Sequence, residues 1–219
     1  MSLGTPRFAS VVLDVDSTLC GVEGIDWLAQ RRGTDVAARC AQFTERAMNG
    51  ELPLEAVYGE RLGVIRPTLR EIAALSQEYR RVLAPGALSA ISRMRAAGVE
   101  VVLVSGGIRR AIEPLVIELG LARDDLFAVE LRWDAAGDYT GFDTESPLTR
   151  QHGKLDVVRS LSLVAPTLAV GDGATDLAMR EAVDAFAAYT QFVRRDRVEQ
   201  SADFVLGSFE ELARLVCTV

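Results

Sequence analysis

The chain has 219 residues, of which 49% are hydrophobic and 25% are charged, a composition that excludes collagen-like and disordered proteins. Its formal net charge is -7, because 31 Asp and Glu outnumber 24 Lys and Arg. That balance argues against a nucleic-acid binder, which needs a basic surface, but it permits a small anionic substrate. The length predicts one large domain, or one domain that carries an inserted smaller one.

Cysteine and histidine usage limits the cofactors and the compartment. The three cysteines form no CxxC pair, which argues against a disulfide framework or a structural zinc site and favours a reducing, cytoplasmic location. The single histidine, His152, argues against most zinc hydrolases, which need several imidazole ligands. No apolar run approaches the roughly 18 residues of a membrane span, so we expect no membrane partner. The oligomeric state stays open between a monomer and a homodimer.

Short apolar runs rich in β-branched residues predict buried strands, and helical patterns lie between them. This alternation predicts a Rossmann-like α/β fold, with a parallel sheet and helices on its faces. The predicted strands, in chain order, are 8–13, 99–104, 167–170, 185–187 and 204–206. The predicted helices around them are 86–97, 109–119, 155–163, 174–182 and 209–216.

Two insertions interrupt this pattern. The segment 20–83 is too long for one crossover, and we interpret it as a helical cap subdomain on a core formed by 1–19 and 84–219. A smaller insertion at about 127–145 predicts a β-hairpin, with strands at 127–133 and 139–142. The predicted cap helices are 22–32, 35–48, 54–65 and 68–81.

Three of the predicted strands end in unusual polar segments. They are Asp14-Val15-Asp16-Ser17-Thr18, Ser105-Gly106-Gly107 and Gly171-Asp172-Gly173-Ala174-Thr175-Asp176. In open parallel sheets, ligands bind beyond the carboxyl ends of the strands. We therefore expect these segments to deliver carboxylates, a hydroxyl and glycine backbone to one crevice.

The acidic residues of these segments indicate a metal site. If the chain stays extended, Asp14 and Asp16 point to the same side, and Asp172 arrives from another strand. Crowded carboxylates repel one another unless one is protonated or a cation lies between them. Oxygen ligands with several waters suit Mg²⁺. One Asp-x-Asp alone is more typical of a solvated turn, but the addition of Asp172 favours the metal.

Other candidate residues carry weaker signals. Ser105 and Gly106 precede a predicted helix, where backbone N–H groups bind anions, although an ordinary βα turn has the same composition. Lys154 can balance phosphoryl charge or lie on the surface. Arg61 falls on the apolar stripe of its helix, so it either meets a carboxylate or phosphate or extends its head to water. Glu23 begins a predicted helix, where acidic residues complement the dipole.

A basic cluster near the C-terminus, Arg194, Arg195 and Arg197, is broken by Asp196. Such short clusters are typical of a solvated face, and we expect no binding site there.

The three polar segments together with Lys154 resemble, in order and spacing, the four motifs of the haloacid dehalogenase-like phosphatase superfamily. The resemblance runs from about residue 8 to about residue 212. Within the superfamily the chain is most similar to the branch that acts on phosphoserine. The matches to that branch are Glu23-Gly24-Ile25-Asp26, Met48 with Gly50, Glu60-Arg61-Leu62 and Gly141-Phe142.

The resemblance implies a Mg²⁺-dependent phosphomonoester hydrolase of serine biosynthesis that converts O-phosphoserine to serine and phosphate. In that scheme Asp14 is the nucleophile that forms an aspartyl-phosphate, and Asp16 is the general acid and base. Mg²⁺ is held by Asp14, the backbone carbonyl of Asp16, and Asp172. Lys154 neutralises charge, and Asp176 supports it or the metal.

The same resemblance implies the substrate contacts. Ser105, Gly106 and Thr175 bind the phosphate region, and Met48 also contacts the substrate. Glu23 meets the ammonium group and Arg61 the carboxylate. The chain departs from its relatives at Thr175, where many superfamily members have Asn, and at Leu54, where relatives often have an aromatic residue.

Two alternatives stay open at this point. One is a phosphatase or phosphotransferase of the same superfamily that acts on another small phosphorylated metabolite. The other is a non-enzymatic phospho-receiver domain, which also gathers acids, Mg²⁺ and a lysine on a parallel sheet. The length argues against the receiver, which has about 120 residues and no long helical insertion.

Overall fold

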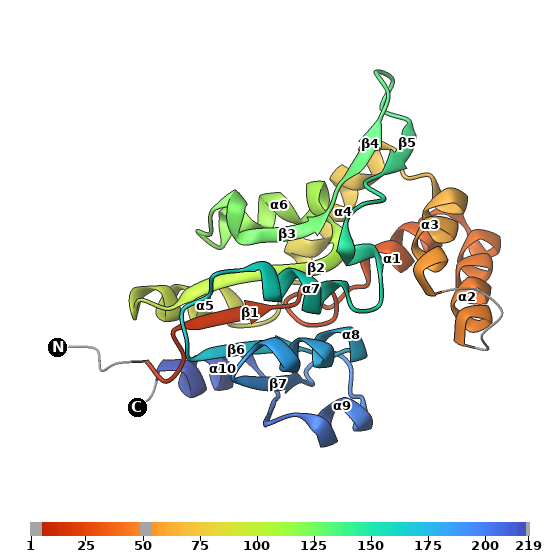
Figure 1. The fold of residues 1–219 in the computed structure, drawn as a ribbon. Helices are drawn as coiled ribbons and strands as arrows, with labels where there is room; N and C mark the ends of the chain where they lie inside the picture. Colours follow the sequence, from red (N-terminus) through yellow and green to blue (C-terminus); the bar gives the residue numbers. More distant parts are fainter. Residues whose placement is uncertain (1–5, 49–53, 218–219) are drawn as a thin grey trace.

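A six-stranded parallel sheet forms the centre of the protein, whose computed structural model describes residues 6–48 and 54–217 (Figure 1). The strand order is β3-β2-β1-β6-β7-β8, and every pairing between neighbours is parallel. The predicted α/β class is therefore confirmed. The strands are β1 (Ser10–Leu13), β2 (Glu100–Ile108), β3 (Leu126–Val129), β6 (Thr167–Gly171), β7 (Ala185–Tyr189) and β8 (Phe204–Leu206).

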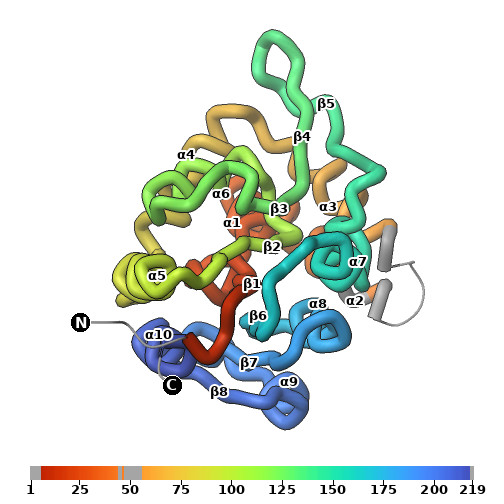
Figure 2. The backbone as a smooth tube through the Cα atoms, turned by 60° about the vertical axis from the view of Figure 1, so that its left-hand side comes forward, coloured from red at the N-terminus to blue at the C-terminus, as the bar shows by residue number. Residues whose placement is uncertain are grey.

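Helices cover both faces of this sheet. Figure 2 shows α5, α6 and α10 on one side of the strands and α7, α8 and α9 on the other. The expected helix at 174–182 is present as one α-helical turn followed by a 3₁₀ segment, Ala178–Ala182. The helices are α5 (Ala87–Ala96), α6 (Arg109–Glu118), α7 (Gly153–Ser160), α8 (Ala174–Leu177), α9 (Asp196–Ser201) and α10 (Phe209–Cys217).

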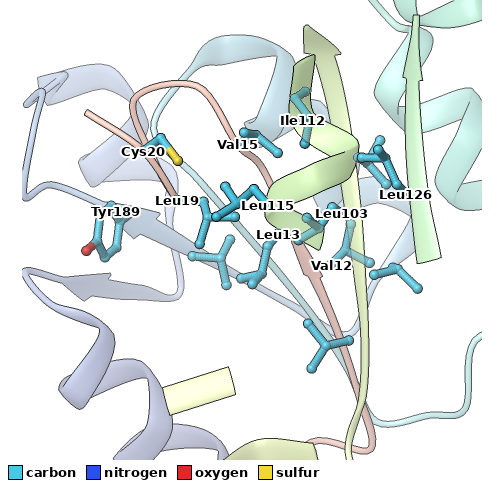
Figure 3. Packing of buried hydrophobic residues seen from close by; sticks show 14 of the residues in the cluster. Val12, Leu13, Val15, Leu19, Cys20, Leu103, Ile112, Leu115, Leu126 and Tyr189 are labelled. Atoms are coloured by element: carbon cyan, nitrogen blue, oxygen red, sulfur yellow. The ribbon is translucent and has the colours of Figure 1, made fainter. Parts of the chain in front are cut away.

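The central strands are buried from end to end, which explains why their sequences are continuous apolar runs rather than alternating ones. Leu13 of β1 lies opposite Leu103 of β2 in the parallel register. Figure 3 shows both side chains with Ile112 and Leu115 of α6, and all four belong to one buried apolar cluster. This core fixes the relative positions of the strand ends that carry the site.

Of four further helices, α1, α2 and α3 lie beyond the carboxyl end of the sheet, and α4 packs beside α6 (Figure 1). They come from the segment between β1 and β2, where the sequence predicts four helices. Backbone hydrogen bonds join the two ends of this segment, from Gly21 N to Val82 O at 2.9 Å and from Ala84 N to Leu19 O at 2.9 Å. The helices are α1 (Gly24–Arg32), α2 (Thr34–Met48), α3 (Leu54–Ile65) and α4 (Leu69–Arg81).

The predicted hairpin strand at 127–133 is wrong in its first half. Leu126–Val129 is β3, which pairs with β2 at the edge of the main sheet, and only β4 (Leu131–Trp133) and β5 (Tyr139–Phe142) form the hairpin. The division falls after Val129, which is buried in the main core. Local periodicity continues across this point, so the sequence could not show that one apolar run serves two sheets.

The hairpin contacts the linker between α3 and α4. Trp133 Nε1 donates a hydrogen bond to the Pro67 carbonyl at 2.8 Å, and Leu69 N donates to the Gly137 carbonyl at 3.0 Å. The β4–β5 hairpin therefore packs against the helical insertion and stabilises its position. In the ranges 6–48 and 54–217, no helix has the length and apolar character of a membrane span.

Candidate active site

The polar segments that follow β1, β2 and β6 meet at one cavity of about 370 Å³. Asp14 and Asp16 come from the end of β1, Gly106 from β2 and Asp172 from the end of β6. They meet because parallel neighbours end at the same edge of a sheet. Residues of the helices beyond that edge, including Glu23 and Arg61, line the opposite side. The expected convergence on one crevice is therefore confirmed.

A buried lysine links two of the acids. Lys154 Nζ lies 2.5 Å from Asp14 Oδ1 and 2.6 Å from Asp176 Oδ1, and all three side chains are at most 10% exposed. Lys154 is the second residue of α7, and Gly153 allows the close approach of that helix. A Cβ atom at position 153 would lie 1.8 Å from the Pro147 carbonyl oxygen. The local backbone thus fixes the lysine beneath the carboxylates.

Three carboxylates come together beside this lysine. Asp14, Asp172 and Asp176 each offer an oxygen, and these oxygens lie within 4.8 Å of one another. Asp172 also accepts a hydrogen bond from Thr18 Oγ1 at 3.1 Å. An all-oxygen donor set of this kind fits a hard divalent cation. The sequence predicts that the Asp16 carboxylate joins this group. In the structure, that carboxylate instead accepts hydrogen bonds from the Tyr79 hydroxyl and from Gly24 N.

The electrostatics of the site explain why a cation would be stabilising. Burial raises the pKa of Asp14 to about 8, and Asp176 adds to the rise while Lys154 opposes it. Burial, together with Glu23, raises the pKa of Asp16 to about 7. Burial opposes charge on Lys154, but Asp14 and Asp176 hold its pKa above the usual value. More negative charge is therefore gathered here than one lysine balances.

The glycine segment of β2 reaches the cavity at one residue. Gly106 lines the cavity, and Ser105 is buried behind it with its Oγ accepting a hydrogen bond from Gly107 N at 2.9 Å. A Cβ atom at Gly107 would lie 2.9 Å from Asp16 Oδ2, so glycine is needed here.

The helical insertion contributes Glu23 and Arg61 to the cavity, and Thr175 lines the sheet side. Glu23 Oε1 accepts a hydrogen bond from Ser17 Oγ at 2.6 Å. Arg61 forms an ion pair with Asp26, so the guanidinium meets a carboxylate. The Met48 side chain, and Gly50, lie outside the described residues.

Two residues of the cavity were missed in the sequence. Arg195 was expected on a solvated face, but its guanidinium contacts the Asp172 carboxylate and it lines the cavity. That expectation was wrong because the sequence does not distinguish the three neighbouring arginines. Their directions depend on where the short helix α9 begins, and Arg195 is the residue just before it. Tyr58, which no motif of the sequence marks, also lines the cavity.

Comparison with known proteins assigns the class. The family model for haloacid dehalogenase-like hydrolases matches residues 11–181, so the chain belongs to this family. It is an enzyme with the fold and the acidic site of a haloacid dehalogenase-like phosphatase. The phospho-receiver alternative is thereby set aside.

The relatives point to one branch of the family. The chloroplastic phosphoserine phosphatase of Arabidopsis thaliana is 36% identical over 208 residues, which cover 93% of this chain and 70% of that protein. The phosphoserine phosphatase of Homo sapiens is 34% identical over 206 residues, or 93% of this chain and 91% of the relative. A solved structure of a phospho-aspartyl intermediate analogue of phosphoserine phosphatase superposes with a TM-score of 0.75 at 25% identity, covering 95% of this chain and 98% of that one.

The raised carboxyl pKa values predict how stability depends on pH. Between their ordinary pKa of 3.8 and the folded values of about 7 and about 8, Asp16 and Asp14 hold protons that the unfolded chain has released. These two groups therefore lower the free energy of unfolding as pH rises from about 4 to about 8. We expect the thermal midpoint in EDTA, followed by circular dichroism, to fall over this range less steeply in Asp14→Asn than in the wild type.

The matched control is Asp156→Asn, an exposed acid on α7, which should keep the wild-type slope. Equal slopes for the wild type and Asp14→Asn would contradict the raised pKa assigned to the buried Asp14 carboxyl group.

Proposed function

We propose that this protein is a Mg²⁺-dependent phosphoserine phosphatase, which hydrolyses O-phosphoserine to serine and phosphate. The observation that carries the proposal is the Asp14 carboxylate, which faces the cavity while Lys154 holds it at 2.5 Å. The names of the two relatives support the same substrate. We propose further that the core is formed by 1–19 and 84–219, and that 20–83 acts as a cap over it.

The acidic cluster fits Mg²⁺, which takes oxygen ligands and keeps several waters. We propose Asp14, Asp172 and the Asp16 backbone carbonyl as its ligands, with Asp176 in support. When bound, the ion would neutralise charge on the phosphoryl oxygens.

In the proposed first step, an Asp14 carboxylate oxygen attacks phosphorus. The new P–O bond to Asp14 forms while the P–O bond to the serine oxygen breaks. Asp16 gives its proton to the departing oxygen, because a serine alkoxide is a poor leaving group. The products of this step are an aspartyl-phosphate at Asp14 and free serine.

In the second step, a water molecule attacks the phosphorus of the aspartyl-phosphate. Asp16, now ionised, takes the proton from this water, and the P–O bond to Asp14 breaks. Phosphate leaves, and both carboxyl groups return to their starting states. Lys154, the Gly106 N–H, Ser105 and Thr175 are proposed to stabilise the negative charge on the phosphoryl oxygens throughout.

Substrate selection is proposed to lie in the cap. Glu23 would bind the ammonium group of phosphoserine, and Arg61 its carboxylate. Arg61 Nε and the Tyr58 hydroxyl are both buried, and neither has a hydrogen-bond partner among the described residues. These residues are three apart on α3, so their side chains lie on neighbouring parts of one helix face. Two unpartnered donors beside one cavity suit an acceptor group such as a carboxylate.

A second candidate is a phosphatase or phosphotransferase that acts on another small phosphorylated metabolite. The ion pair between Arg61 and Asp26 favours it, because a substrate without a carboxylate would leave this pair intact. A phosphotransferase would yield more alcohol than free phosphate when an acceptor alcohol is present.

The compartment and the assembly stay predictions. The three cysteines, Cys20, Cys40 and Cys217, are present as thiols rather than disulfides, which supports the cytoplasmic location expected from the sequence. Either a monomer or a homodimer is compatible with a cavity built from one chain.

The nucleophile is tested by Asp14→Asn. An amide cannot attack phosphorus, so phosphate release from phosphoserine with MgCl₂ should fall by at least about a thousandfold. The exposed acid variant Asp156→Asn serves as the control and should retain wild-type turnover. Appreciable turnover in a purified, folded Asp14→Asn protein would refute the assignment.

The substrate assignment is tested by Arg61→Ala with two esters of similar leaving group. Loss of the guanidinium should lower kcat/KM for phosphoserine by about 100-fold, since a charged partner is left unpaired. Phosphoethanolamine, which lacks the carboxylate, should be affected less than about threefold. Arg70→Ala, an exposed arginine on α4, is the control. Equal losses on both esters would remove phosphoserine as the preferred substrate and leave the phosphatase class standing.

A further inference from the structure

One oxygen of Asp16 is held from the helical insertion. Asp16 Oδ1 accepts a hydrogen bond from the Tyr79 hydroxyl at 2.6 Å and another from Gly24 N at 3.3 Å. Tyr79 belongs to α4 and Gly24 is the first residue of α1, so both donors come from the segment between β1 and β2. Tyr79 is fully buried. A buried hydroxyl that donates to a carboxylate makes a strong, directional hydrogen bond.

The other oxygen of Asp16 lies beside β2. A Cβ atom at Gly107 would lie 2.9 Å from Asp16 Oδ2, so this oxygen lies against the glycine segment of β2. Gly106 of the same segment lines the cavity, as does Asp16 itself. The two carboxylate oxygens thus have different surroundings: Oδ1 accepts hydrogen bonds from the insertion, and Oδ2 lies against Gly107, the residue after Gly106 of the cavity.

Gly24 is needed for the hydrogen bond from Tyr79 to Asp16. A Cβ atom at position 24 would lie 2.3 Å from the Tyr79 hydroxyl oxygen. Any larger residue would displace the hydroxyl from Asp16. Tyr79 itself is not among the residues that line the cavity, so it reaches the site through Asp16.

We propose that Tyr79 is a positioning residue, which with Gly24 fixes the Asp16 carboxylate so that Oδ2 exchanges the proton with the leaving oxygen. The inference rests on the proposed function, in which Asp16 is the general acid. The terminal torsion of an aspartate is broad, so an unclamped carboxylate rotates away from the productive orientation. Proton transfer needs the donor within hydrogen-bond reach of the leaving oxygen, and misplacement slows that step.

The test is the leaving-group dependence of Tyr79→Phe. This variant keeps the buried ring and removes only the donor. For kcat/KM, which reports the step in which the alcohol departs, we expect a loss of about 10- to 100-fold with phosphoserine. With p-nitrophenyl phosphate, whose leaving group departs without a proton, the loss should stay below about threefold.

Two further variants complete the test. Gly24→Ala should give the same leaving-group-dependent loss, since its Cβ displaces the Tyr79 hydroxyl. Tyr189→Phe removes a tyrosine hydroxyl that lies away from the cavity and donates a hydrogen bond to Gln191 Oε1. This variant should leave kcat/KM for both esters unchanged. Thermal unfolding of each variant confirms that the proteins compared are folded.

Equal losses of kcat/KM on the two esters would show that Tyr79 has only a structural role. No loss on either ester would show that Asp16 acts without the Tyr79 hydrogen bond. Both outcomes overturn the inference and leave the phosphatase standing. If the wild-type protein releases phosphate from p-nitrophenyl phosphate but not from phosphoserine, the proposed substrate is wrong. Phosphoethanolamine then replaces phosphoserine in the comparison of the variants. Wild-type protein inactive on every ester would overturn the proposed function.

Discussion

The site depends on the buried contact of one lysine with two carboxylates. Lys154 lies between Asp14 and Asp176, and none of the three can lose its partners without leaving an unpaired charge in a buried place. Asp172 lies nearby in contact with Arg195, so the three carboxylates of the cluster face two cationic side chains. A divalent cation at the strand ends would neutralise this excess of negative charge, and together with Lys154 it would stabilise the negative charge of a phosphoryl group.

The rest of the fold maintains that charge cluster. The parallel sheet brings Asp14 and Asp172 to one edge because β1 and β6 are neighbours in register. Gly153 allows α7 to approach closely enough to deliver Lys154. The helical insertion lines the opposite side of the cavity and holds Asp16 through Tyr79, so the two parts of the chain meet at a catalytic candidate.

Much of this arrangement was predictable, because Asp and Gly segments that follow parallel strands indicate which edge of the sheet carries the site. The strands of the predicted set followed from short apolar runs between helical patterns, and the four helices of the insertion followed from the length and pattern of 20–83. The sequence could not show the features that depend on contacts between residues far apart in the chain. β3 joins the main sheet although its sequence runs on into the hairpin, and Arg195 rather than Arg194 turns toward Asp172. Tyr79 looks like any core aromatic until its hydroxyl meets Asp16.

Calorimetry of MgCl₂ binding shows whether the buried carboxylates form an incomplete charge cluster that a divalent cation completes. Titrations near neutral pH, in buffers of different ionisation enthalpy, count the protons released when the ion binds. Since burial raises the pKa of Asp14 to about 8, Mg²⁺ binding to the wild type should release protons, and binding to Asp172→Asn should be greatly weakened. Binding of equal strength in both proteins, or no binding to the wild type, would contradict this interpretation.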